Sequence, residues 1–191
     1  PFIGRILTAD DVKSCFAKID DEVLKQFKEV YKEGEIKKGR NLLAFEVAKR
    51  NVLNFLKQEL ESIEKNHDEI QIISLETTYE RTLTDPRLPF PVLIKGNVDR
   101  IEIRNGNIRI IDYKTGKVDG NSLKIQDFGD LTSDIKNEKI IQLLCYALMF
   151  ENHELKQNRE VSAGIVSFKN MKNGFLPFGL GKGKDAELVI S

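Results

Sequence analysis

The sequence predicts a mixed α/β fold, and three stretches carry that prediction. Asn105-Gly106 separates two runs rich in β-branched and aromatic residues. This pattern is a strong signal for a β-hairpin, because both central positions of a type I′ turn need positive φ. Apolar residues recur at helical spacing from Asn41 to Lys65, and a second, more apolar helix is predicted from Lys139 to Phe150.

Length and composition predict one globular domain over residues 1–191. Hydrophobic residues make up 40% of the chain and charged residues 31%, which is typical of globular rather than disordered chains. The 30 basic residues balance the 30 acidic ones, so any surface that binds nucleic acid must be locally basic. The chain begins at Pro1 without a methionine, and we expect it to be a fragment of a longer protein.

No apolar run is long enough to span a membrane, and no signal peptide precedes the first predicted helix. Cys15 and Cys145 lack the close spacing of cysteine ligands to a metal. We therefore expect free thiols, no membrane partner, and a reduced, cytoplasmic setting.

The other elements are predicted from caps, periodicity and turn residues. Thr8 followed by acids is typical of a helix start, and Asp20 opens a second helical stretch that Gly34 ends. Further along the chain, we expect a strand at 70–76, a proline-rich loop at 82–91, an irregular segment at 117–139, a strand at 161–168 and a flexible glycine- and lysine-rich segment at 179–184.

The register of the predicted hairpin decides its chemistry. If Asn105 and Gly106 are the central turn residues, counting outward places Asp99 opposite Asp112, on the face that carries Ile101, Ile103, Ile108 and Ile110. Lys114 lies two residues past Asp112 and points to the same face. If Gly106 and Asn107 were the central pair instead, Asp99 would face Lys114 and the group would reduce to a salt bridge.

Two carboxylates opposed at the end of an apolar face repel each other unless a cation lies between them. A hard divalent ion fits such an oxygen-rich site, and Mg²⁺ typically takes one or two carboxylates together with waters and phosphate oxygens. A neighbouring lysine can polarise the attacking water or stabilise charge on a phosphate. From spacing alone, two solvated aspartates and a surface lysine remain an equally open alternative.

Three separated motifs occur in this order: Gly96-Asn-Val-Asp-Arg100, Ile111-Asp-Tyr-Lys-Thr-Gly116 and Gln142-Leu-Leu-Cys-Tyr146. Together they resemble the PD-(D/E)XK nuclease superfamily, and more narrowly the RecB-like nuclease domain of the RecB, AddA and AddB helicase-nucleases. The resemblance covers roughly Leu75 to Tyr146. It implies a restriction-endonuclease-like core, in which a central mixed β-sheet is flanked by helices.

The resemblance also implies a role for each hairpin residue. Asp99 and Asp112 are the expected catalytic, metal-binding carboxylates, and the backbone carbonyl of Tyr113 is a further metal ligand. Lys114 is the expected catalytic lysine. The expected cofactor is Mg²⁺, for which Mn²⁺ substitutes, and the cysteine spacing argues against the iron–sulfur cluster of some relatives.

Gln142 and Tyr146 stand at i and i+4 of a predicted helix and so share one face. The resemblance assigns them to active-site support or DNA contact. RecB-like members often place a histidine on the helix predicted here at 41–65, but residues 39–57 contain none. Glu46 is the nearest residue able to ligate a hard cation, although a solvated helix glutamate is the favoured interpretation. Glu76 resembles a recurrent acid of the family and is assigned a supporting role.

The expected function is metal-dependent hydrolysis of DNA phosphodiester bonds in repair or recombination. The expected partners are DNA and a helicase domain or subunit. The alternative is a catalytically weak relative that binds DNA or scaffolds a helicase complex. The sequence leaves exonuclease against endonuclease activity open.

Overall fold

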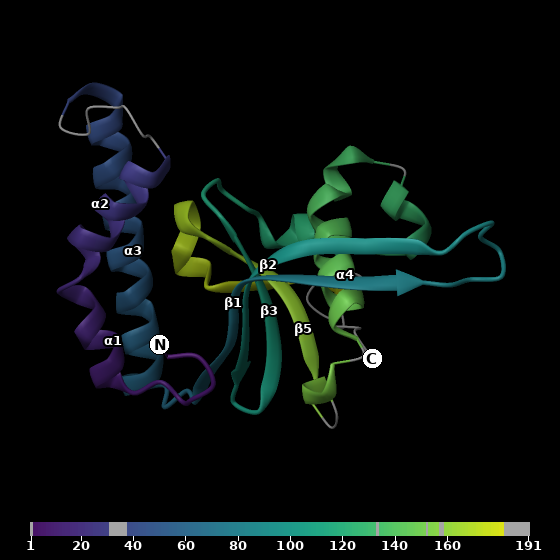
Figure 1. Cartoon of the computed structure of the whole chain (residues 1–191), viewed down its shortest axis with the longest axis horizontal. Helices are drawn as coiled ribbons and strands as arrows, with labels where there is room; N and C mark the ends of the chain where they lie inside the picture. Colours follow the sequence, from purple (N-terminus) through teal and green to yellow (C-terminus); the bar gives the residue numbers. More distant parts are fainter. Residues whose placement is uncertain (1, 31–37, 133, 152, 157–158, 182–191) are drawn as a thin grey trace. The chain divides into compact units, whose positions relative to one another are not determined.

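The computed structural model describes residues 2–30, 38–132, 134–151, 153–156 and 159–181. They group into two compact units, a helical unit formed mainly by Ile6–Glu69 and a sheet unit that begins at Ile70 and includes Ile3–Arg5 (Figure 1). The proposed helix stop Gly34 lies outside the described residues, as do residues 182–184 of the glycine- and lysine-rich segment.

The helical unit contains α1 (Ala9–Phe16), α2 (Ile19–Val30) and α3 (Gly39–Lys65). The predicted cap at Thr8 is confirmed. Its hydroxyl accepts a hydrogen bond from the Asp11 backbone N–H at 3.2 Å, and the Asp11 carboxylate accepts one from the Thr8 N–H at 2.9 Å. Backbone N–H groups at the start of a helix have no partner within the helix, so pairing them with side chains stabilises the start of α1. The long helix begins two residues before its predicted start.

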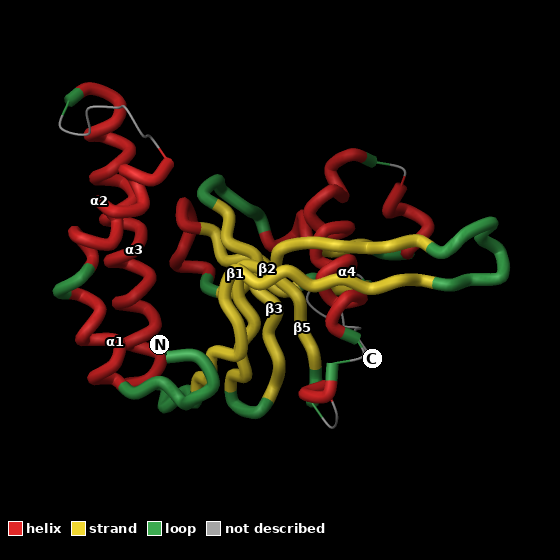
Figure 2. The backbone as a smooth tube through the Cα atoms, in the orientation of Figure 1, coloured by secondary structure: helices red, strands yellow, loops and turns green. Residues whose placement is uncertain are grey.

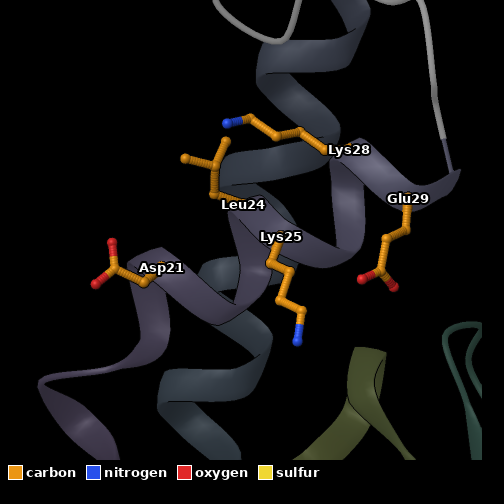
Figure 3. A pocket seen from close by; sticks show the side chains of 5 residues that line it. All are labelled: Asp21, Leu24, Lys25, Lys28 and Glu29. Atoms are coloured by element: carbon orange, nitrogen blue, oxygen red, sulfur yellow. The ribbon is translucent and has the colours of Figure 1, made fainter.

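The exposed side of α2 carries charges of both signs. Figure 3 shows Asp21, Lys25, Lys28 and Glu29, together with Leu24, on successive turns of this helix. The two acids offset the two lysines, so this surface has no net charge that would select an anion. Within the part of the chain that the structure describes, no helix combines the length and apolarity needed to cross a membrane.

The sheet unit is built on the mixed five-stranded sheet that was expected (Figure 2). The strand order is β1-β2-β3-β5-β6, with β3 and β5 parallel and the other neighbours antiparallel. The strands are β1 (Ile70–Leu83), β2 (Val92–Arg104), β3 (Asn107–Lys114), β5 (Val161–Ser167) and β6 (Phe175–Pro177). The first strand is longer than predicted because it pairs with β2 as far as Leu83, inside the expected loop.

Among the described residues, the connection from β3 to β5 contains four short 3-10 segments and the helix α4 (Glu138–Phe150). The prediction of a flexible segment from residue 179 is wrong at its start. Gly179 and Leu180 form the strand β7, which pairs in parallel with β4 (Lys124–Ile125). A two-residue strand has no periodicity, and backbone hydrogen bonding to β4 holds it in place.

The core of the sheet unit lies between α4 and one face of the sheet. The helix contributes apolar side chains at helical spacing, and β3 and β5 contribute the alternate residues of the facing surface. The members most fully withdrawn from solvent are Ile101, Ile108, Ile110, Leu123, Ile140, Leu143, Phe150, Ala163, Ile165 and Phe178. Each large apolar side chain buried in this way stabilises the fold by about 1.5–3 kcal/mol, and together they fix α4 beside the end of β3.

The β1–β2 ribbon reverses its faces at Asp99. A Cβ on Gly96 would meet the side chains of Tyr146 and Met149, so Gly96 faces α4, while Val98 and Ile101 both belong to the core beneath that helix. A regular strand would put residues 98 and 101 on opposite faces. The ladder omits the position where Glu76 would pair with Asp99, and Glu76 has a φ of 47°. Beyond this point the ribbon projects past the rest of the sheet (Figure 1).

Candidate active site

The hairpin between β2 and β3 has the predicted register. Asn105 and Gly106 have φ values of 52° and 85°, as the central residues of a type I′ turn require. The ladder pairs residues 104 with 107, 103 with 108 and 101 with 110, and it ends at Arg100–Ile111. The alternative turn centred on Gly106-Asn107 is wrong. The ladder therefore stops one step before residues 99 and 112.

The Asp99 side chain continues the ladder where the backbone pairing stops. Its Oδ2 accepts a hydrogen bond from the Tyr113 N–H at 2.7 Å. The N–H and C=O of one residue in an extended strand point to the same edge, so the Tyr113 carbonyl faces the Asp99 side of β3 as well. The Asp99 carboxylate and the Tyr113 carbonyl, which come from adjacent strands, therefore both lie on the side where β2 and β3 face each other.

Asp112 is buried and held by Lys114. Its side chain is 3% exposed, against 30% for Lys114. The ammonium donates a hydrogen bond to Oδ1 at 3.0 Å and lies 2.7 Å from Oδ2. Oδ2 nevertheless has no partner in hydrogen-bond geometry among the described residues. Asp112 is therefore not the solvated strand-end aspartate of the alternative interpretation. Its buried Oδ2 contacts the Lys114 ammonium without a well-directed hydrogen bond, so it can still accept a ligand.

The charges around Asp112 oppose one another. Burial raises the pKa of the Asp112 carboxyl; the hydrogen bond and charge of Lys114 lower it, the charge of Asp99 raises it, and the charge of Lys139 lowers it. The Coulombic effect of Asp99 indicates that the two carboxylates lie close enough to repel each other. A further positive charge would relieve both the burial and the repulsion.

Gln142 and Tyr146 extend from α4 toward Lys114, as their shared helix face predicted. Lys114 Nζ donates to Gln142 Oε1 at 3.0 Å, and Gln142 Nε2 donates to the Tyr146 hydroxyl at 2.7 Å. Because the amide nitrogen is engaged by the phenol, the amide oxygen is directed at the ammonium. Burial raises the pKa of the Tyr146 phenol, which keeps it neutral.

The other face of β3 holds the Tyr113 ring in place. This ring stacks on Phe168 with centroids 5.5 Å apart, and Arg100 Nη1 donates to its hydroxyl at 3.3 Å. Arg100 also forms an ion pair with Glu102, and both are buried. These contacts restrain the peptide groups between Asp112 and Lys114. The role of Phe168 was missed, because nothing in the sequence links the end of β5 to residue 113.

Two polar residues, one at the end of β5 and one just after it, hold the chain as it leaves β3. The Asn170 amide accepts a hydrogen bond from the Val118 N–H at 3.2 Å and donates one to the Val118 carbonyl at 2.7 Å. The Ser167 hydroxyl donates to the Gly116 carbonyl at 2.7 Å. These residues carry no motif, and only the parallel pairing of β3 with β5 brings them together.

Two acids that the sequence singled out have other partners. Glu46 lies on α3 in the helical unit, is 55% exposed and pairs with Lys49 at 3.7 Å. Glu76 accepts a hydrogen bond from the Asn97 amide at 2.9 Å, across the ribbon beside Asp99.

The donor set at the end of the β2–β3 ladder suits a hard divalent cation. Among the described residues, no three or more His, Cys, Asp or Glu side chains cluster closely enough to share an ion. Asp99, Asp112 and the Tyr113 carbonyl supply oxygen only, and Asp112 Oδ2 is buried beside the Lys114 ammonium. Mg²⁺ keeps several waters and needs only one or two carboxylates, so these residues fit it.

Comparison with known families agrees with the geometry. The model of the PD-(D/E)XK nuclease superfamily matches residues 7–189, which is nearly the whole chain. No curated protein matches the sequence. Members of the superfamily are typically nucleases, and their mixed sheet flanked by helices is the restriction-endonuclease-like architecture seen here. The chain therefore belongs to the PD-(D/E)XK nuclease superfamily.

Proposed function

We propose that the protein is a Mg²⁺-dependent deoxyribonuclease, a RecB-like module that hydrolyses DNA phosphodiester bonds in repair or recombination. One observation supports the proposal: the β2–β3 ladder stops one step before Asp99 and Asp112, and Lys114 forms an ion pair and a hydrogen bond with the buried Asp112 carboxylate. A structural salt bridge would not need a second carboxylate at this place.

In this proposal Asp99, Asp112 and the Tyr113 carbonyl hold the metal. Asp99 is oriented for this by the Tyr113 N–H, which occupies Oδ2 and leaves Oδ1 without a hydrogen bond among the described residues. Asp112 would bind the metal through its buried carboxylate, which the ion pair with Lys114 holds in place. A bound divalent ion lowers the pKa of a coordinated water and offsets the negative charge that develops on the phosphate.

Lys114 positions the reacting groups. Its ammonium has three N–H donors, of which Asp112 and Gln142 engage two. The third is available to orient the attacking water or to bind a phosphate oxygen whose charge grows in the transition state. Gln142 and Tyr146 keep the ammonium in this orientation, because each is fixed by the next hydrogen bond in the chain.

We infer a substrate that is bound through its backbone, since no base-reading motif accompanies the site. The RecB-like motifs support a helicase domain or subunit as the partner.

The second candidate is a catalytically weak module that binds DNA or scaffolds a helicase complex. The observation that favours it is the donor set, which among the described residues has two carboxylates and no third acidic or histidine ligand. Calorimetric titration with Mn²⁺ distinguishes the two functions, because a scaffold needs no metal. Saturable binding that is lost in Asp112→Ala supports the nuclease.

Digestion of plasmid DNA and of end-labelled oligonucleotides, with Mg²⁺, Mn²⁺ or EDTA, tests the main proposal. Lys114→Ala and Asp112→Ala should each lower the cleavage rate by about 10²–10⁴-fold, as expected for the loss of a group acting on the transition state. Lys95→Ala is the matched control, because its ammonium is exposed and, among the described residues, pairs only with Glu80. Metal-dependent cleavage that survives both active-site substitutions would refute the assignment.

A further inference from the structure

Lys139 lies on the same helix, α4, as Gln142 and Tyr146, the two residues whose hydrogen bonds lead to Lys114. Lys139, Gln142 and Tyr146 are spaced i, i+3 and i+7, so they lie on one face of the helix. Gln142 and Tyr146 are already directed at the active site by their hydrogen bonds. Lys139 is therefore the residue of this face that lies one turn closer to the helix start.

The Lys139 side chain starts about one helical turn before Gln142, whose amide oxygen is hydrogen-bonded to Lys114. Its positive charge lowers the pKa of the Asp112 carboxyl, as the charge of Lys114 does. Its side chain is 34% exposed, and its contact is Glu138 Oε1 at 3.2 Å, on a side chain that is 67% exposed. An exposed pair of adjacent residues is weak and is screened by salt, so an anion can displace it.

Helix stability does not account for a lysine at this position. The first turn of a helix carries partial positive charge, which favours acids and disfavours cations. Glu138 satisfies this preference, whereas Lys139 opposes it. The position gains from a cation if an anion is bound beside it.

We propose that Lys139 binds a phosphate of the DNA strand next to the scissile phosphate. Lys139 lies about one helical turn from Gln142, and the Gln142 side chain is hydrogen-bonded to Lys114. A long, flexible lysine side chain that starts this close to Lys114 can reach the phosphate next to the one bound there. The inference rests on the proposed function, since it takes the scissile phosphate to lie at Asp99, Asp112 and Lys114, but it assigns Lys139 to substrate binding and not to catalysis.

Salt-dependent DNA binding tests this assignment. The dissociation constant for a fluorescent oligonucleotide is measured by anisotropy at several salt concentrations in full chains that carry Lys114→Ala to suppress cutting. Adding Lys139→Ala should raise Kd by about 3–10-fold at low salt, and should reduce the slope of log Kd against log salt by about 0.9, the contribution of one phosphate. Lys139→Arg should restore most of both quantities.

Lys136→Ala is the matched control, because Lys136 lies three residues away, is 85% exposed and pairs with Asp134. It should change neither quantity. In the active protein, Lys139→Ala should raise KM and leave kcat nearly unchanged. An unchanged Kd and slope in Lys139→Ala, or an equal change in Lys136→Ala, would overturn the inference.

The two proposals fail in different ways. If Lys114→Ala and Asp112→Ala cut as fast as the unaltered protein, the proposed catalytic site is wrong. If they do not cut and Lys139→Ala binds DNA normally, only the phosphate contact is wrong.

Discussion

At the scale of single residues, Gln142 determines how Lys114, the proposed catalytic lysine, is oriented. A lysine stem has four rotatable bonds, so an ammonium is rarely fixed without several partners. Here Asp112 holds Lys114 from its own strand and Gln142 holds it from α4. The Tyr146 hydroxyl in turn selects which end of the Gln142 amide faces the ammonium. Lys114, Gln142 and Tyr146 act as a unit, in which Tyr146 orients Gln142 and Gln142 orients Lys114.

This series of hydrogen bonds, from Tyr146 through Gln142 to Lys114, predicts a graded loss of activity. Gln142→Leu removes both hydrogen bonds and should lower kcat by about 10–100-fold, the usual effect of losing a residue that orients a reactive group. Tyr146→Phe removes one neutral hydrogen bond, worth about 0.5–1.5 kcal/mol, and should lower kcat by about 2–10-fold. Steady-state kinetics on a labelled oligonucleotide measures both. A larger loss of kcat in Tyr146→Phe than in Gln142→Leu would contradict this order of hydrogen bonds.

At the scale of secondary-structure elements, the site is made by the reversal in the β1–β2 ribbon. Up to Asp99, the residues of β2 that face α4 are Gly96 and Val98, and after it they are Ile101 and Ile103. The irregularity leaves Asp99 outside the ladder, where its side chain and not its backbone meets β3. Distortions of this kind re-aim side chains and are common beside active sites.

Local chemistry explains why part of this was predictable. The register follows from Asn105-Gly106, because few other dipeptides accept two positive φ values, and the alternation of isoleucines then places residues 112 and 114 on the buried face. The shared face of Gln142 and Tyr146 follows from helical spacing alone. Each of these features depends on residues close together in the sequence.

The remaining features depend on contacts between distant segments. The positive φ of Glu76 reflects the path of the ribbon and not a preference of glutamate. The parallel pairing of β3 with β5 joins residues about 50 positions apart, and the Asn170 contact with Val118 exists only because of it. Neither has a motif or a period from which it could be predicted.

Gly96 lies where the β1–β2 ribbon packs against Tyr146, the first residue of the hydrogen-bond series that leads to Lys114. An added Cβ would lie 3.2 Å from the Met149 methyl and 3.3 Å from the Tyr146 ring. Gly96→Ala should therefore displace Tyr146, lowering kcat, and should reduce the free energy of unfolding by about 1–3 kcal/mol, as overpacking does. Urea denaturation and the cleavage assay measure these effects. Gly116→Ala is the control, because nothing lies within 4 Å of its added Cβ, and equal effects of the two variants would contradict this role.

At the scale of the whole molecule, the two compact units differ in the residues that they offer to the proposed metal site. The family match spans residues 7–189 and so covers both compact units, while a single domain over residues 1–191 stays a prediction. The hairpin donors all belong to the sheet unit, and Glu46 belongs to the helical unit. Its pairing with Lys49 and its exposure favour a solvated glutamate over a ligand.

Metal-dependent thermal unfolding decides between these roles. A ligand at about 100 times its dissociation constant stabilises the folded state by about 2.7 kcal/mol. For a chain of 191 residues, this raises Tm by roughly 5–11 °C. Wild-type protein should show such a shift with Mn²⁺. Asp112→Asn should lose it, and its Tm without metal should not fall, because the substitution removes a buried charge whose burial is costly. Glu46→Gln should keep the full shift; if it loses the shift as Asp112→Asn does, the interpretation of Glu46 as a solvated glutamate is wrong.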